Sequence, residues 1–277
     1  MIKLSHTVFA LPFALCSAWL AAGGVPAPRV LGLVVICAVA ARSAAMGFNR
    51  YVDRDIDARN PRTASRALPA GLLSPRFVLG FIACCSAVFL GAAALLGPIC
   101  LALAPLVLAV LFGYSYAKRF TAAAHLVLGF ALALAPLGAW VAVRGEIAGD
   151  LTAPLLLGAL VMLWVAGFDV IYACQDAGFD RAAGLHAVPA RFGVAKALWI
   201  ARLLHVGAGA VVLVLAVTSG LGWFQLLGSA AFLGLLALQH TLVRASDLSR
   251  VDVAFFTLNG WASVIYFGAT ALDLALR

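Results

Sequence analysis

Two clusters of aspartates are the part of this sequence best suited to chemistry. Asp53 and Asp57 lie four residues apart, and Asp176 and Asp180 repeat that spacing in a chain with only 11 acidic residues among 277. Like charges beside apolar segments are costly unless cations compensate them. Carboxylate oxygens suit Mg²⁺, which proteins hold through one or two carboxylates together with substrate phosphates and water. The clusters therefore predict a magnesium site for a phosphorylated substrate.

The first cluster is predicted to present its ligands from one side of a helix. At about 100° per residue, Asn49, Asp53 and Asp57 fall on a common face. Asp55 points away from that face. We expect Asn49, Asp53 and Asp57 to be metal ligands and Asp55 to be dispensable.

The second cluster extends over several helical turns. Asp169, Tyr172, Asp176 and Asp180 share a face if the helix continues past Gly178. We expect Asp176 and Asp180 to complete the metal ligands. Tyr172 is expected to contact substrate, and Asp169 is a candidate general base for a phenolic proton.

Cationic side chains near the clusters are predicted to bind a diphosphate. Arg54, Arg62 and Arg66 follow the first cluster, and Tyr114 and Lys118 lie one turn apart at the end of an apolar segment. Tyr114 and Lys118 are candidate catalytic groups at the diphosphate, although Lys118 also fits an ordinary interfacial anchor. The sequence has no glycine-rich phosphate loop and no serine-hydrolase or zinc-protease motif. Recognition of phosphate through metal and these cations is the simplest account.

Arg42 is the candidate that would recognise a second substrate. It lies seven residues before Asn49, hence only about 20° away around the same helix, and deeper in the membrane. A cation there is costly, and the sequence offers few acids at that depth to pair with it. An acceptor with its own carboxylate would suit the two-pronged guanidinium. The alternative is that Arg42 pairs with a buried polar group or a helix carbonyl.

The elements that carry these residues are predicted to be membrane helices. The chain is 65% hydrophobic and 11% charged, against about 45–50% and 25% in a soluble domain. A helix of about 20 residues crosses a bilayer and pairs its own backbone amides there. Gly97 and Pro98, and the glycine-rich residues 218–222, break two runs that are too long for one crossing. We predict nine spans, at residues 5–24, 30–50, 76–96, 99–117, 121–143, 152–173, 195–218, 222–243 and 253–273.

The predicted fold is all-α, an integral membrane bundle that forms one domain over residues 1–277. The two aspartate pairs follow the second and the sixth span, and a basic, proline-containing loop comes after each pair. This repeat predicts two four-helix halves plus one helix. The central cavity between the halves would open to the cytoplasmic face.

The charge distribution predicts topology. Most Lys and Arg residues lie at the N-terminus or after even-numbered spans, and the other side carries only Arg29, Arg144 and Arg277. By the positive-inside rule, the N-terminus and both clusters are cytoplasmic and the C-terminus is outside, in a multi-pass protein of the inner (cytoplasmic) membrane. The net charge of +8 then reflects a lipid bilayer partner and no nucleic acid. A signal peptide is the alternative for the first span, but Lys3 is a single basic residue where signal peptides have a positively charged N-terminal region.

Cysteines and histidines show no metal-binding spacing. The six cysteines lie in or at the ends of apolar spans and are expected to be small buried hydrophobes. The five histidines are scattered and are expected to be packed or interfacial. Only His186 lies in the loop beside the second cluster.

These motifs resemble a known family. The spacing from Asn49 through Asp53 to Asp57, the Tyr114–Lys118 pair, and the Asp176–Asp180 pair together are similar to the signature of the UbiA superfamily of membrane prenyltransferases. The resemblance covers essentially the whole chain. It implies two Mg²⁺ ions, one at each pair, and a polyprenyl diphosphate whose tail lies along a lateral opening toward lipid. One departure is Arg50, where many members have an aspartate after the asparagine.

The resemblance extends to a bacterial 4-hydroxybenzoate polyprenyltransferase-like branch associated with the futalosine route to menaquinone. Its basis is three segments, NRYVDRDIDARNPRTASRALPAG, YSYAKRF and YACQDAGFDRAAGLHAVPARFG. It implies transfer to an aromatic acid, 4-hydroxybenzoate or 1,4-dihydroxy-6-naphthoate, in ubiquinone or menaquinone biosynthesis. Transfer to a non-acid acceptor is an alternative. A cation-coupled transporter is an alternative of another class, but the acids gather at one membrane face and not at mid-bilayer.

Overall fold

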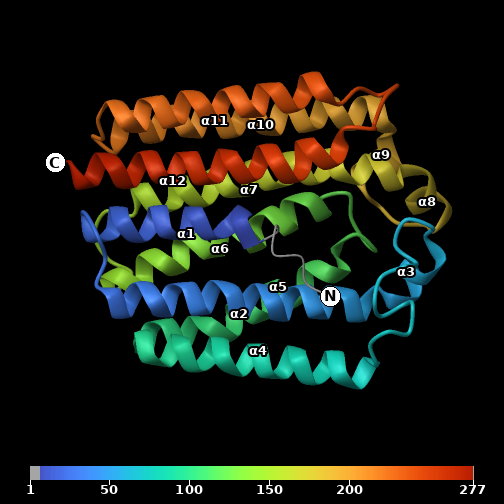
Figure 1. Cartoon of the computed structure of the whole chain (residues 1–277), viewed down its shortest axis with the longest axis horizontal. Coiled ribbons are helices and arrows are strands. Elements are labelled where there is room, and N and C mark those ends of the chain that lie inside the picture. Colours follow the sequence, from blue (N-terminus) through green and yellow to red (C-terminus); the bar gives the residue numbers. More distant parts are fainter. Residues whose placement is uncertain (1–6, 277) are drawn as a thin grey trace.

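The computed structural model describes residues 7–276 of the chain. Lys3 and Arg277, which contribute to the predicted topology, and the start of the first predicted span lie outside the described residues. The described chain is all-helical, and its long helices lie side by side (Figure 1). They are α1 (Thr7–Ala22), α2 (Pro28–Val52), α4 (Pro75–Leu96), α5 (Pro98–Ala117), α6 (Ala124–Arg144), α7 (Thr152–Ala173), α10 (Val194–Thr218), α11 (Trp223–Leu242) and α12 (Asn259–Ala275).

The predicted spans agree with these helices to within a few residues. Within residues 7–276, eight helices are long and apolar enough to cross a membrane, and α1 is apolar but shorter. Gly97 separates α4 from α5 with a φ of 144°, a conformation that suits glycine. The predicted breaks therefore lie where the chain turns back.

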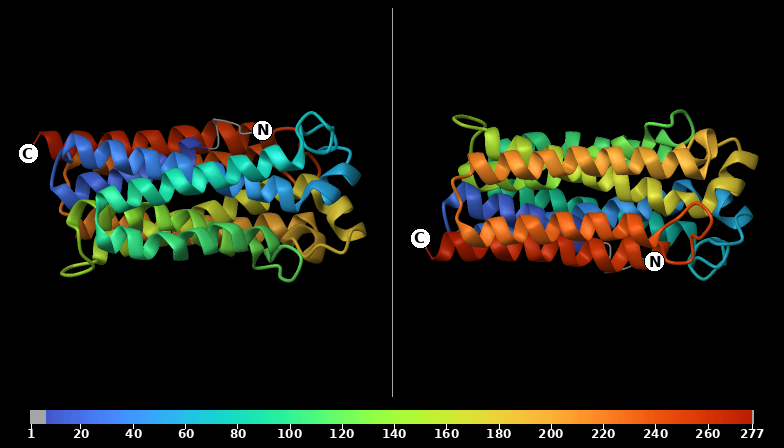
Figure 2. Two further views of the ribbon diagram at one scale, coloured as in Figure 1. Left: turned by 90° about the horizontal axis from the view of Figure 1, so that it is seen from below. Right: turned by 90° about the horizontal axis from the view of Figure 1, so that it is seen from above.

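Short helices gather at one end of the bundle. These are α3 (Arg54–Arg59), α8 (Ala177–Ala182) and α9 (Val188–Phe192), all at the right of Figure 1. A 3₁₀ turn, η2 (Cys174–Asp176), joins α7 to α8. The two turned views in Figure 2 keep these helices at the same end. Both aspartate clusters lie there.

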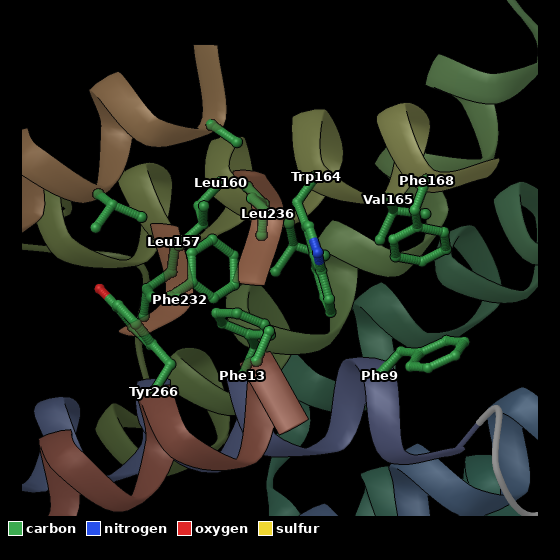
Figure 3. Packing of buried hydrophobic residues seen from close by; sticks show 14 of the residues in the cluster. Phe9, Phe13, Leu157, Leu160, Trp164, Val165, Phe168, Phe232, Leu236 and Tyr266 are labelled. Carbon is green, nitrogen blue, oxygen red and sulfur yellow. The ribbon is translucent and has the colours of Figure 1, made fainter. Parts of the chain in front are cut away.

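An aromatic core holds the middle of the bundle together. Trp164 of α7 is fully buried, and its ring centroid is 5.1 Å from Phe13 of α1 and 5.8 Å from Phe232 of α11 (Figure 3). Such tilted ring contacts add stability beyond the burial of area. Residues from three helices thereby fix α1 against α7 and α11.

A π-helical segment, η3 (Val253–Leu258), precedes α12. Asn259 donates hydrogen bonds to the carbonyls of Ala254 and Phe255, at 3.1 and 3.0 Å. Its side-chain oxygen accepts a bond from Trp164 Nε1 at 2.8 Å. These bonds satisfy backbone groups of the widened turn in a region without water. They also hold the Phe255 ring 4.2 Å from the ring of Tyr172.

Helices α6 and α7 pack with their backbones in contact. A Cβ atom on Gly129 of α6 would lie 2.2 Å from the carbonyl oxygen of Met162 on α7. Small residues permit such close crossings between membrane helices. The register of α6 on α7 is therefore fixed at the level of the backbone.

Candidate functional site

A cavity of about 1130 Å³ connects the aspartate clusters to the apolar interior. Its lining extends along α2 from Val34 to Asp53, the residue directly after the helix, a rise of roughly 28 Å at 1.5 Å per residue. Carboxylates and cations line one end. Apolar side chains such as Leu96 and the partly buried Trp140 line the remainder. The cavity has the shape and polarity for a long apolar molecule with a charged head.

The two clusters share a backbone conformation. Asp53 follows α2 with φ −89° and ψ 1°, and Asp176 ends η2 with φ −101° and ψ 4°. Both values lie in the sparsely populated bridge region, where many active-site residues are found. In each cluster the second aspartate, Asp57 or Asp180, is the fourth residue of a six-residue helix. The repeat expected from sequence is thus present in the backbone.

The prediction that the first cluster lies on one continuous helix is wrong. In the second cluster α8 continues past Gly178, but the helix is interrupted before that residue, at η2. Because ψ at Asp53 is near zero, α2 ends at Val52 and α3 begins at Arg54. Beyond Ala173 the second cluster continues through η2 into α8. Each pair of aspartates is therefore positioned by a turn between two helices, and the turn directs both carboxylates toward the cavity.

Asp53 is the most heavily neutralised carboxylate. Its side chain is 3% exposed, and its Oδ2 lies 2.5 Å from Lys118 Nζ. Arg119 Nη2 lies 3.2 Å from its Oδ1, and Asn49 donates to Oδ2 at 3.3 Å. The end of α5 thus supplies two cations to a carboxylate at the end of α2.

Asp57 has one satisfied and one unsatisfied oxygen. Arg66 Nη1 donates to Oδ1 at 2.6 Å. The buried Oδ2 has no hydrogen-bond partner among residues 7–276, and Arg50 Nη1 lies 3.9 Å from it. A buried anionic oxygen without a donor is costly. It marks a place where a cation would be stabilised.

Asp176 is held by the loop that follows the first cluster. Arg62 binds it with two guanidinium nitrogens, one of them at 2.8 Å, and Asn60 donates to it at 2.9 Å. Arg62 also donates to the Tyr172 hydroxyl at 3.0 Å. Burial opposes the charge of Arg62, but the bonds and charge of Asp176 and Tyr172 outweigh it, so its pKa lies above the ordinary value. Asp180, by contrast, makes no ion pair or hydrogen bond through its side chain in the described part of the chain.

Arg42 lies in the cavity wall about three helical turns before Asp53, between the charged end and the apolar part of the cavity. Its Nε atom is buried without a hydrogen-bond partner among the described residues. The charges of Arg42, Arg50 and Asp53 all act on the Tyr114 hydroxyl, which lines the same cavity. The guanidinium of Arg42 has no acid partner within residues 7–276.

Asp169 also lines the cavity and is bonded to a histidine. His125 Nδ1 lies 2.6 Å from Asp169 Oδ2. The backbone N–H of Val188 donates to His125 Nε2 at 3.2 Å. His125 is buried, as expected of a packed histidine, but it is also part of the cavity lining.

The structure brings together all but one of the predicted site residues. Arg54 does not line the cavity, and it donates to the Tyr51 carbonyl at 3.0 Å while its side chain lies over the Tyr51 ring. Asp55 is likewise outside, with 79% of its side chain exposed. The residues found at the charged end without having been predicted are Arg50, Asn60, Arg119 and His125.

Comparison with known proteins identifies the family. The sequence profile of the UbiA prenyltransferase family matches residues 10–261. This chain belongs to the UbiA prenyltransferase family. It is accordingly a transferase, and it is similar to a 4-hydroxybenzoate octaprenyltransferase from Nitrosospira multiformis, with 31% identity over 94% of this chain and 88% of that protein.

Solved structures of UbiA members have the same fold. The apo structure of a UbiA homolog from Aeropyrum pernix K1 is 35% identical, covers 99% of both chains and superposes with a TM-score of 0.89. A UbiA homolog from Archaeoglobus fulgidus, solved bound to DMAPP and Mg²⁺, is 17% identical and covers 97% of this chain and 95% of that one, with a TM-score of 0.74. UbiA membership agrees with an integral membrane protein and sets aside the transporter.

Proposed function

We propose that this UbiA member transfers a polyprenyl group from a polyprenyl diphosphate to an aromatic acid, in a reaction that requires Mg²⁺. The observation that carries the proposal is the single cavity that joins the aspartate clusters to a long apolar channel, with Arg42 between them. The acceptor is 4-hydroxybenzoate or 1,4-dihydroxy-6-naphthoate, in ubiquinone or menaquinone biosynthesis. The names of similar proteins support the first of these acids.

The donor set fits Mg²⁺ that is shared with a diphosphate. Its side-chain ligands are all oxygens, and the unpartnered Oδ2 of Asp57 is available for a cation. No group of three or more His, Cys, Asp or Glu side chains in residues 7–276 is arranged to hold a metal by itself, which agrees with an ion completed by phosphate oxygens. We propose two ions, one held by Asn49, Asp53 and Asp57 and the other by Asp176 and Asp180. When bound, they would neutralise the charge that develops on the departing diphosphate.

The protein's own cations perform the rest of that stabilisation. Arg66 and Lys118 are already at the charged end through their bonds to Asp57 and Asp53. A diphosphate that binds beside the aspartates would draw these side chains, and Arg62, onto its oxygens. Tyr114 lines the same cavity and would donate a hydrogen bond to the diphosphate. Preorganised donors of this kind stabilise a leaving group at little reorganisation cost.

The allylic carbon that becomes cationic would lie against aromatic rings. Phe168, Tyr172 and Phe255 line the cavity next to the second cluster, and their ring centroids are 4.2 to 5.1 Å apart for the pairs that include Phe255. Aromatic faces attract cations. The loop that carries Arg62 and the segment that leads into α9 would cover the site and exclude water that would quench the cation.

We further infer the topology that goes with this function. The whole chain would form one domain of nine transmembrane helices, with α1 as the first, in two four-helix halves plus one. The short helices α3, α8 and α9 and the cavity mouth would lie at the cytoplasmic face of the inner membrane, with the N-terminus inside and the C-terminus outside. The basic loops between α2 and α4 and between α7 and α10 support this orientation.

The acceptor assignment is tested through Arg42. Arg42→Ala should raise the KM for 4-hydroxybenzoate by about tenfold or more, because a charge-assisted bond contributes about 1.5–3 kcal/mol. The KM for the prenyl diphosphate should change little, and Arg42→Lys should restore only part of the loss. Steady-state kinetics with purified protein, Mg²⁺ and both acids measures these values, with EDTA as the metal-free control.

A matched ligand and a matched variant sharpen this test. The methyl ester of 4-hydroxybenzoate lacks the carboxylate, so wild-type protein should prefer the acid and Arg42→Ala should lose that preference. Arg202→Ala is the control variant, because Arg202 lies over Trp199 on α10 and not in the cavity wall. Equal loss of donor and acceptor affinity in a folded Arg42→Ala protein would remove the argument for an acidic acceptor.

A further inference from the structure

We infer that His125 is a positioning residue for the transfer reaction: it holds Asp169 in the cavity as the base that accepts the acceptor's hydroxyl proton. The inference rests on the proposed function, since it concerns the same site and an aromatic hydroxyl acceptor. Its basis is a chain of two hydrogen bonds that connects the backbone of Val188, the imidazole of His125 and the carboxylate of Asp169.

The neighbours of His125 determine which ring nitrogen carries the proton. The backbone N–H of Val188 can only donate, so His125 Nε2 must accept with its lone pair. In a neutral imidazole the proton is then on Nδ1, which donates to Asp169 Oδ2 at 2.6 Å. Both nitrogens are thus used by partners that fix the tautomer and the plane of the ring.

This arrangement leaves one oxygen of Asp169 for substrate. Oδ2 is bonded to His125, whereas Oδ1 takes part in no hydrogen bond within residues 7–276. Asp169 lines the cavity, and 24% of its side chain is exposed. A carboxylate anchored through one oxygen presents the other in a fixed direction, which general base catalysis requires.

The position of this pair in the cavity suits an acceptor that is anchored at its other end. Asp169 lies one turn before Tyr172 on α7, within the aromatic wall, and Arg42 lines the same cavity from α2. An acceptor with a carboxylate at one end and a hydroxyl at the other has one group for each of these residues. The carboxylate would bind the arginine, and the hydroxyl would face the aspartate.

The step assigned to Asp169 balances in atoms and charge. Oδ1 takes the hydroxyl proton, and the phenolate's electron density forms the bond from the adjacent ring carbon to the allylic C1 as the C1–O bond to diphosphate breaks. The diphosphate leaves with the electron pair of that bond. The ring carbon then loses its hydrogen as a proton, and the oxygen recovers a proton from Asp169. The net products are the prenylated acid, diphosphate and one proton.

A purely structural role for His125 would depend on a different one of its two ring nitrogens. The segment before α9 is also held by the bond from the His186 N–H to the Lys118 carbonyl, at 2.8 Å. If His125 served only to dock this segment, the bond from Val188 to Nε2 would be the important one. If it positions the base, the bond from Nδ1 to Asp169 is the important one. Two substitutions separate these bonds.

The test compares His125→Asn with His125→Gln. The asparagine amide nitrogen occupies roughly the place of Nδ1 and can donate to Asp169, whereas the glutamine amide oxygen reaches the place of Nε2 and can accept from Val188. We expect His125→Asn to retain the larger share of kcat and His125→Gln to lose at least about tenfold more, within the 10²–10⁴-fold range of general base catalysis. KM for the prenyl diphosphate should be unchanged in both.

Asp169→Asn provides a second, independent measurement. It should lower kcat at least as much as His125→Gln, and combining the two substitutions should add little further loss, because both act through one base. All variants are compared at matched thermal stability in detergent. If the order of the asparagine and glutamine variants were reversed, or if Asp169→Asn kept wild-type kcat, the role of His125 would be overturned while the proposed function stood. A folded wild-type protein that prenylates neither acid would overturn both.

Discussion

The two aspartate clusters have the same backbone geometry but are neutralised in different ways. Asp53 and Asp57 bind cations that come from α2, α5 and the loop directly after α3. Within residues 7–276, the second cluster is bound by no cation from its own segment: Asp176 is bound by Arg62 from the loop after α3, and Asp180 has no partner. The first cluster is therefore neutralised by residues between Arg50 and Arg119, whereas the second depends on its contact with the loop after α3.

This difference bears on which contacts stabilise the site. The buried carboxylate of Asp53 is in contact with two cations, Lys118 and Arg119. Removing either the carboxylate or the cations would leave the opposite charge uncompensated. In the Arg62–Asp176 pair the carboxylate is more exposed, with 15% of the Asp176 side chain accessible, and the pair joins the loop after α3 to the segment that follows α7. Activity should require both clusters equally, but stability should depend mainly on the first.

The largest expected effect is the loss of either cluster. Asp53→Ala, Asp57→Ala, Asp176→Ala and Asp180→Ala should each reduce transfer at least about a thousandfold, because each removes a metal ligand at the leaving group. Diphosphate release and product formation, measured across Mg²⁺ concentrations, check this. The comparison predicts that Asp53→Ala lowers the Tm in detergent more than Asp176→Ala does. Equal Tm values for these two variants would contradict the difference between the clusters.

An intermediate effect is expected from the cations. Lys118→Ala and Arg66→Ala should raise the KM for prenyl diphosphate about tenfold and the KM for the acceptor much less, because each loses a charge-assisted bond to phosphate. Arg62→Ala should do the same and should also weaken the contact between the loop after α3 and Asp176, seen as faster proteolysis of that loop. If the acceptor KM alone rose, these residues would belong to the acceptor site.

The smallest effect is expected at Asp55. This residue lies in the sequence of the first cluster but is exposed and pairs only with Arg54, 3.6 Å away. Asp55→Ala should change kcat and both KM values by less than about twofold, as is usual for surface substitutions. The same assays apply, with Asp57→Ala as the matched variant two residues away. A loss at Asp55 comparable to that at Asp57 would contradict the assignment of faces.

The long helices could be predicted from the sequence because the length of a hydrophobic segment is a local property of the chain. The span predicted at residues 152–173 coincides with α7, and the breaks at Gly97 and after Thr218 are present. The short helices α3, α8 and α9 were not predicted, since a helix of five or six residues has no periodicity to detect. The turn at Asp53 was missed because it depends on tertiary contacts to Lys118 and Arg119.

In the site, too, features set by local sequence could be predicted, whereas features set by tertiary contacts could not. Spacing alone placed Asn49 and the four aspartates at one cavity, and position along a helix placed Arg42 in its wall. Arg119 is adjacent to a predicted residue. Arg50 was visible only as a departure from the family pattern, although it lies beside Asp57. The role of His125 could not be read from its neighbours in sequence, because Asp169 meets it across the contact between α6 and α7.

That contact has a mechanical consequence. Gly129 lies one turn after His125, and the backbone of α7 occupies the space that a side chain would need. Because the contact is between two backbones, no side-chain rotamer can change to let the helices slide. We therefore expect α6 and α7 to move as one rigid unit that carries His125 and Asp169. The loop from Asn60 to Ser74 is attached to the end of this unit by hydrogen bonds from Asn60 and Arg62 to Asp176, which can break and re-form. A conformational change that admits the charged head of a substrate should therefore move this loop and leave α6 and α7 in place.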